Sequence, residues 1–149
     1  MQPARADDEL RDTVASRLRT DGQRVTAARA SLVDVLARAN RPLTIPEIRG
    51  HAPALATSSA YRNLSVLEAA GVVHRIVTTG DHARYELAED LTGHHHHLIC
   101  SQCGAVEDVP ASSRLEQSVA KAADEIGRRT GFRTQHHRVD LVGLCHRCT

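Results

Sequence analysis

The sequence predicts an α+β fold, with an N-terminal winged helix-turn-helix domain and a C-terminal α/β dimerisation and metal-binding domain. Three observations lead to this prediction. Apolar residues recur at helical spacing in the first part of the chain, and the spacing changes to that of strands between Val72 and Leu87. All four cysteines and most of the ten histidines follow that change. The 149 residues suffice for one domain or two small ones, and the scarcity of aromatic residues predicts an aliphatic core.

Two helices are predicted first. One runs from Asp7 to about Arg19 with apolar residues every fourth position, and it ends before Gly22. The second starts at Thr26, whose hydroxyl suits an N-cap, and stops at Asn40 and Pro42. Its expected buried residues are Leu32, Val35, Leu36 and Ala39.

Two further helices follow. The stretch Thr44-Ile45-Pro46-Glu47 has the pattern of a capping box with proline in the first turn, where the missing N–H costs nothing. The next helix is expected to have Thr57 as its N-cap and to end at Gly71. Its inward side chains would be Ala60, Leu64 and Leu67.

A β-hairpin is predicted between Val72 and Leu87, with Thr79-Gly80-Asp81 as its turn. Short helices followed by a hairpin form the winged helix-turn-helix pattern, in which one helix enters the DNA major groove. The candidate DNA-binding residues are polar or basic and lie away from the apolar stripe: Arg24, Arg29, Ser58, Ser59, Tyr61 and Arg62. The alternative is that these side chains only solvate an exposed helix face.

The C-terminal part follows a polar stretch, residues 89–93, which is typical of a linker, so the expected domains are 1–88 and 94–149. Its expected elements are strands at residues 95–100 and 105–109, a helix at 113–129 and a last strand at 133–144. The helix would bury Leu115, Val119, Ala122 and Ile126. These aliphatic surfaces could pair across a dimer axis.

Two Cys-x-x-Cys pairs supply four thiolates, the set that a closed structural zinc site requires. The four residues are Cys100, Cys103, Cys145 and Cys148. The sequence has no signal-peptide core and no apolar run of membrane length, so we expect a cytoplasmic protein without a membrane partner, where paired cysteines favour metal over disulfides. A redox motif of the thioredoxin type and an iron–sulfur centre are the alternatives.

Four consecutive histidines, His94 to His97, precede Cys100. On a strand, His95 and His97 share one face while His94 and His96 share the other, so the run could serve two metals. For the first face, candidate partners are His74 and Glu86 of the hairpin. For the second, they are Glu116 and either His136 or His137. A purification tag is disfavoured because the run is internal and continues into an apolar strand.

The motifs HHHHLICSQCGAVEDV, GFRTQHHRVDLVGLCHRC and SSAYRNLSVLEAAGVV resemble the ferric uptake regulator superfamily over roughly residues 22–148. The resemblance implies a homodimeric bacterial transcription regulator that occupies palindromic operators with metal bound and represses metal uptake or stress genes. It also implies roles for the three sets of residues. They are a structural zinc site (Cys100, Cys103, Cys145, Cys148), a sensing site between domains (His74, Glu86, His95, His97) and a third site (His94, His96, Glu116, His137).

The chain also departs from the iron-sensing pattern. Iron-sensing members place a histidine before the third helix, whereas NRPLTIPEI has none, and His74 stands where zinc uptake regulators commonly have a ligand. The resemblance is therefore strongest to the zinc uptake branch, although the cysteine usual there is absent and Glu86 would replace it. A set of three nitrogens and one oxygen favours Zn²⁺ as the second, regulatory metal over Fe²⁺ or Mn²⁺, and nickel is also compatible. Iron or peroxide sensing are the alternatives, with a zinc hydrolase as a remote one.

Overall fold

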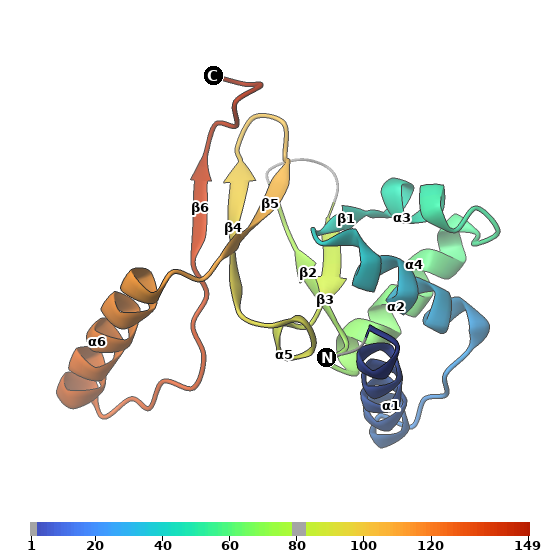
Figure 1. Ribbon diagram of the computed structural model, residues 1–149, viewed down its shortest axis with the longest axis horizontal. Coiled ribbons are helices and arrows are strands. Elements are labelled where there is room, and N and C mark those ends of the chain that lie inside the picture. Colours follow the sequence, from blue (N-terminus) through green and yellow to red (C-terminus); the bar gives the residue numbers. More distant parts are fainter. Residues whose placement is uncertain (1–2, 79–82) are drawn as a thin grey trace.

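The computed structural model describes residues 3–78 and 83–149, with side-chain surroundings given from Asp7 onward (Figure 1). The expected Thr79-Gly80-Asp81 turn lies outside the described residues. The helices and strands of the N-terminal domain are α1 (Pro3–Thr20), α2 (Ala27–Ala39), β1 (Leu43–Thr44), α3 (Ile45–His51), α4 (Thr57–Ala69), β2 (Val73–Ile76) and β3 (Arg84–Leu87). Those of the C-terminal part are α5 (Glu89–Thr92), β4 (His95–Cys100), β5 (Val106–Pro110), α6 (Ser113–Thr130) and β6 (Asp140–Gly143).

Local capping fixes two of the helix starts. The Thr26 hydroxyl accepts a hydrogen bond from the Arg29 amide, and Asn40 ends α2 in the left-handed conformation, as expected. At α3 the predicted capping box is present, since Thr44 and Glu47 each accept a backbone N–H of the other. The start of α4 is one residue earlier than expected: Ala56 is its N-cap, and Thr57 is the first helical residue because the Ala60 amide already bonds to the Ala56 carbonyl.

The N-terminal helices pack around a small antiparallel sheet with strand order β1-β3-β2. Their aliphatic side chains form one continuous core to which α1, α2, α3, α4 and all three strands contribute. Leu32, Leu64 and Leu67 are fully buried in it, whereas Val35 and Ala39 are half-buried and Val33 takes a core position that the helical stripe did not predict. Strand β1 was not predicted either, because two residues carry no recognisable period. The helices and hairpin form a winged helix.

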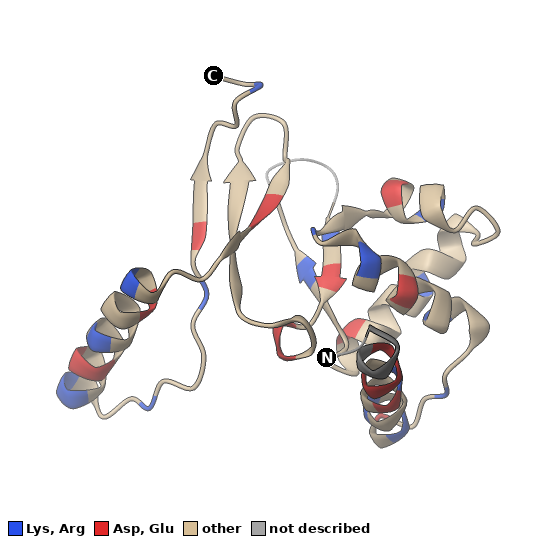
Figure 2. Ribbon diagram, viewed as in Figure 1, with Lys and Arg blue, Asp and Glu red and all other residues tan. Residues whose placement is uncertain are grey.

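The C-terminal sheet has the order β5-β4-β6, with β4 paired antiparallel to β5 and parallel to β6 (Figure 1). Helix α6 projects from this sheet and has no buried residue: Leu115 and Val119 are half-buried, whereas Ala122 and Ile126, also expected to be buried, are exposed. The expected last strand is shorter, since residues 131–139 form an irregular segment before β6. Residues 89–92 of the expected linker form the short helix α5. Acidic and basic residues alternate along the surface of α6 (Figure 2).

The two halves touch through the wing, which is the hairpin formed by β2 and β3. Ile76 of β2 packs with Ile99 and Val106 in a second, small buried cluster. Arg84 of β3 donates from Nε to the carbonyl oxygen of Gly104 (2.8 Å), and its other guanidinium nitrogen lies 3.2 Å from the Glu47 carboxylate. The wing is therefore held against the Cys-x-x-Cys turn. No helix among the described residues is long and apolar enough to cross a membrane.

Candidate metal centres and DNA-binding face

The four cysteines meet at one end of the C-terminal sheet. Cys100 ends β4, Cys103 lies in the following turn, and Cys145 and Cys148 follow β6, which pairs in parallel with β4. Their sulfur atoms all lie within 4.8 Å of one another, and the Cys103 and Cys145 sulfurs are 3.7 Å apart. A Zn–S distance of about 2.3 Å in a tetrahedron places sulfurs about 3.8 Å apart. The cluster therefore fits one tetrahedral metal ion.

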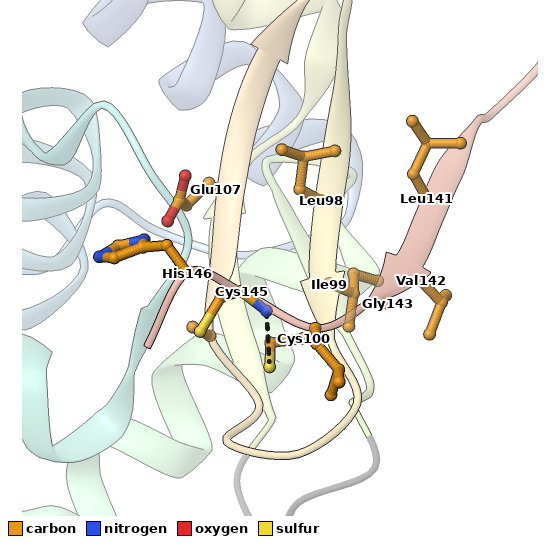
Figure 3. A pocket seen from close by; sticks show the side chains of 11 residues that line it. Leu98, Ile99, Cys100, Glu107, Leu141, Val142, Gly143, Cys145 and His146 are labelled. Carbon is orange, nitrogen blue, oxygen red and sulfur yellow. Dashed lines mark hydrogen bonds between the residues drawn. The ribbon is translucent and has the colours of Figure 1, made fainter. Parts of the chain in front are cut away.

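Backbone amides favour the thiolate form of Cys100. The Cys145 amide donates to the Cys100 sulfur at 3.4 Å, and Figure 3 shows these two residues facing each other. Hydrogen bonds from the backbone at Cys103 and Cys145 lower the pKa of the Cys100 thiol to about 6, although burial opposes them. All four cysteines are unbridged. Metal ligation requires the thiolate, so the surroundings of Cys100 suit it.

Strand β4 divides the four histidines between its two faces. The His95 and His97 rings lie 5.0 Å apart, and the His94 and His96 rings lie 4.8 Å apart. His96 and His97 are buried. Each pair joins a different cluster of acidic and imidazole groups, as the alternation of a strand requires.

The first cluster joins the wing to β4. Glu86 of β3 lies 3.1 Å from the Nε2 atom of His95 and 3.1 Å from that of His97. Asp108 of β5 approaches the same two nitrogens at 4.0 and 3.9 Å. Ligand atoms of these four residues all lie within 4.8 Å of one another. The cluster thus offers two imidazole nitrogens and two carboxylates, drawn from both halves of the molecule.

Outer contacts orient both imidazoles. Nδ1 of His95 lies 2.9 Å from the Gly93 carbonyl oxygen, so this nitrogen carries the proton and donates. Nδ1 of His97 donates in the same way to the Asp140 carboxylate at 3.2 Å. In the neutral rings both Nε2 lone pairs are thereby left for the cluster, an arrangement that is common for metal-binding histidines.

The charges of Glu86, His95 and His97 stabilise one another. Burial raises the pKa of Glu86, but hydrogen bonds from His74, His97 and His95 outweigh this and lower it to about 2. Burial lowers the pKa of His95 and His97, but hydrogen bonds, including those to Glu86, outweigh it and raise both. Burial and the nearby Glu86 charge raise the pKa of Asp108. Its buried Oδ1 atom has no hydrogen-bond partner among the described residues, and a cation at the cluster would coordinate this oxygen.

His74 was expected in this set, and the structure places it beside the cluster. Its Nδ1 atom lies 3.4 Å from Glu86, but its Nε2 atom lies 2.7 Å from the Arg138 guanidinium. The fourth member of the cluster is Asp108. Sequence reasoning missed Asp108, although its position on the strand predicted after the Cys-x-x-Cys turn was the available signal: antiparallel pairing sets it opposite His97.

The second cluster lies on the other face of β4 and includes the four residues expected there. Glu116 of α6 contacts His96 Nε2 at 2.6 Å, His94 Nε2 at 3.0 Å and His137 Nε2 at 3.1 Å. The ligand atoms lie within 4.8 Å of one another. The hydrogen bond from His96 lowers the pKa of Glu116. His137, and not His136, is therefore the histidine of the last segment that reaches this cluster.

The orientation of His94 fits a metal ligand. Its Nδ1 atom contacts the Glu89 carboxylate, which fixes the proton there. Its Nε2 atom then faces the Nε2 atom of His137 at 3.0 Å, and two imidazole lone pairs at that distance repel unless a cation or a proton lies between them. The donor chemistry of this cluster fits a divalent metal that would also attach α6 to the sheet.

The candidate DNA-binding residues divide into two groups. Ser58, Tyr61 and Arg62 are exposed on α4, with Tyr61 54% exposed. Arg29 instead holds α4 in place: its guanidinium bonds to the Asn63 side chain (3.0 Å) and to the Arg24 carbonyl (2.6 Å). Arg24 is exposed and Ser59 of α4 is half-buried.

Known proteins resemble this chain in sequence and in structure. A family model described as the ferric uptake regulator family matches residues 20–142. The peroxide operon regulator of Bacillus subtilis is 27% identical over 147 residues, 95% of this chain and 94% of that protein. The ferric uptake regulation protein of the same organism is 28% identical over 144 residues, 92% and 93% of the two chains. The Helicobacter pylori ferric uptake regulator structure matches with a TM-score of 0.74 at 24% identity, covering 95% and 93% of the two chains.

A winged helix joined to a sheet that carries clustered cysteines, histidines and carboxylates defines a metal-responsive regulator of transcription. The chain belongs to the ferric uptake regulator family. Members of this family are regulators that bind DNA as dimers and are not enzymes, which excludes the hydrolase alternative. The match to the ferric uptake regulator structure confirms the predicted fold class.

Proposed function

We propose that this protein is a repressor whose operator affinity depends on a divalent metal bound by Glu86, His95, His97 and Asp108. The observation that carries the proposal is the origin of these residues, because Glu86 belongs to the wing while the other three belong to the C-terminal sheet. A cation held by all four has its full set of contacts only when the two halves are closed on each other. A ligand that binds one arrangement better shifts the population toward it.

The regulatory metal that we propose is Fe²⁺. The sequence favoured zinc because the expected ligand set had three nitrogens, one of them from His74. The cluster itself contains two carboxylates and two imidazoles. Oxygen-rich sites with imidazoles suit Fe²⁺ and Mn²⁺. The similarity to the ferric uptake and peroxide operon regulators of Bacillus subtilis supports iron, and peroxide sensing would act through the same site.

Zinc sensing is the second candidate. The Glu86 carboxylate already lies 3.1–3.2 Å from the Nε2 atoms of His95 and His97, close to the edge of a tetrahedron with ligands about 2.0 Å from zinc. Under either metal, we propose that the four-cysteine site holds structural zinc, that His94, His96, Glu116 and His137 form a third metal site, and that the regulated genes serve metal homeostasis.

The dimer that we propose uses the exposed apolar surface of the C-terminal half. Leu98 and Leu141 are partners in the register of β4 and β6 and lie on one face of the sheet, where Leu141 is 58% exposed, whereas Val142, 65% exposed, points to the other face (Figure 3). The exposed apolar side of α6 is a second surface that such a dimer would cover. Such a dimer would fix the distance between its two α4 helices, which would then fit successive major grooves of a palindromic operator with Tyr61 and Arg62 facing the DNA.

The test is a fluorescence anisotropy titration against operator fragments selected in vitro from a random DNA pool. Protein with metal in the four-cysteine site is titrated with and without Fe²⁺, Mn²⁺ or Zn²⁺. We expect tight binding only with added metal, and loss of that dependence in His97→Ala but not in His51→Ala, whose histidine is exposed on α3. Equal operator affinity with and without metal would overturn the proposal.

A further inference from the structure

A ring of side chains surrounds the regulatory cluster and crosses between the two halves of the molecule. Arg138 lies in the irregular segment before β6, and its guanidinium contacts His74 of β2 at 2.7 Å. The same guanidinium lies 3.5 Å from Asp140, whose other oxygen accepts from His97 at 3.2 Å. His74 and His97 both approach Glu86, which closes the ring. The hollow inside is lined by these residues together with His95, Glu89 and Val139.

The chemistry of a guanidinium fixes the state of His74. Arginine offers only N–H donors and stays charged, so the Nε2 atom of His74 must accept. The proton of the neutral ring is then on Nδ1, which points toward a Glu86 oxygen at 3.4 Å. Both ring nitrogens are engaged, and His74 has no lone pair to give to a metal while Arg138 is in place.

Displacing Arg138 would change this. Once the guanidinium leaves, the ring proton can move through solvent to Nε2, and the Nδ1 lone pair then lies beside Glu86, next to the other donors. The Arg138 side chain is 50% exposed, so it can return to water without losing solvation. Its positive charge near the cluster also opposes binding of a cation there.

We propose that Arg138 is a positioning residue that decides whether His74 joins the regulatory metal site. With Arg138 paired to His74, the site has the four ligands Glu86, His95, His97 and Asp108. With Arg138 displaced, His74 becomes a fifth, nitrogen ligand. The inference rests on the proposed regulatory function of this site and adds a residue that sets its affinity and donor composition.

The test uses Co²⁺, whose visible absorption reports coordination number and donor type. Full-length protein with zinc in the four-cysteine site is titrated with Co²⁺, and bands lost in His97→Ala identify the regulatory site. Arg138→Ala should bind Co²⁺ at this site at least about tenfold more tightly, within the range of outer-ligand effects on metal affinity. Its absorption should change to that of a site with an added imidazole.

The double variant His74→Ala with Arg138→Ala decides the mechanism. In the double variant, both the changed spectrum and the gain in affinity that depends on His74 should disappear. The control Arg133→Ala, at an exposed arginine of the same segment, should match the wild type. An unchanged spectrum in Arg138→Ala, or a change that persists without His74, overturns the inference. Absence of any Co²⁺ band sensitive to His97→Ala would instead overturn the proposed regulatory site itself.

Discussion

Removing metal from the four-cysteine site should unfold the C-terminal domain and leave the winged helix folded. The perturbation is Cys103→Ser, or a strong chelator applied to the wild type. In the described part of the chain beyond residue 93, the buried hydrophobic residues are Ile99, Cys100 and Val106, and Ile99 and Val106 pack on Ile76 of the wing. The winged helix, in contrast, has an extensive aliphatic core of its own. The C-terminal domain therefore depends on interactions other than its core.

The expected magnitude follows from that difference. Burying Ile76, Ile99 and Val106 stabilises the fold by about 1.5–3 kcal/mol each, or about 5–9 kcal/mol together. A structural zinc site contributes about 10–16 kcal/mol of apparent binding free energy near neutral pH. The free energy of metal binding is thus larger than that of burying the apolar cluster. The apolar cluster therefore cannot offset the loss of the metal. Since α6 and β6 are exposed in the single chain, a dimer that covers them should dissociate as well.

Hydrogen–deuterium exchange with mass spectrometry measures both halves at once. After chelation, amides of β4, β5 and β6 should exchange rapidly while those of α2 and α4 keep their protection. Analytical ultracentrifugation should show monomers. If the C-terminal strands stay protected without metal, or if the winged helix loses protection to the same degree, the reasoning from core size is wrong.

Three further predictions concern other parts of the molecule. Arg84→Ala should lower the free energy of unfolding by about 1–3 kcal/mol, because the hydrogen bonds from Arg84 to the Gly104 carbonyl and to the Glu47 carboxylate are lost. In urea unfolding, a loss no larger than that of the exposed control Arg75→Ala would contradict this prediction. Metal affinity at the regulatory site should fall as the pH is lowered from about 8 to about 6, because protons compete for His95 and His97, whose raised pKa values extend that competition to higher pH; calorimetric titrations giving one affinity at both pH values would refute this. Arg62→Ala should weaken operator binding and reduce the slope of log affinity against log salt by about 1, with unchanged thermal stability; an unaltered slope would place Arg62 outside the phosphate contacts.

Local signals in the sequence were sufficient for most elements. Helical spacing, the Thr26 cap and the Thr44 capping box place α2 and α3, because these interactions span only a few residues. The period of a strand also separates the four histidines into two pairs. Where local signals are weak, the prediction differed: β1 is too short to show a period, and the segment expected as a long last strand is irregular before Asp140.

Contacts between distant segments were not readable in the same way. Asp108 enters the cluster because the register between β5 and β4 sets it opposite His97. His74 is held by Arg138, which lies 64 positions away in the sequence. Arg29, expected to face DNA, is bonded to Asn63 of α4. Each of these positions depends on which side chains meet after the chain folds.

The sequence by itself determined the fold class, the four-cysteine set and the division of the histidines, since all three follow from residue type and short-range spacing. The tertiary structure decided which carboxylates and imidazoles share a cluster, and it brings Asp108 together with Glu86, His95 and His97 while His74 lies beside Glu86 and Arg138. The physical reason is that metal preference depends on the donors gathered within a few ångströms. That gathering is a property of strand register and of the contact between the two halves.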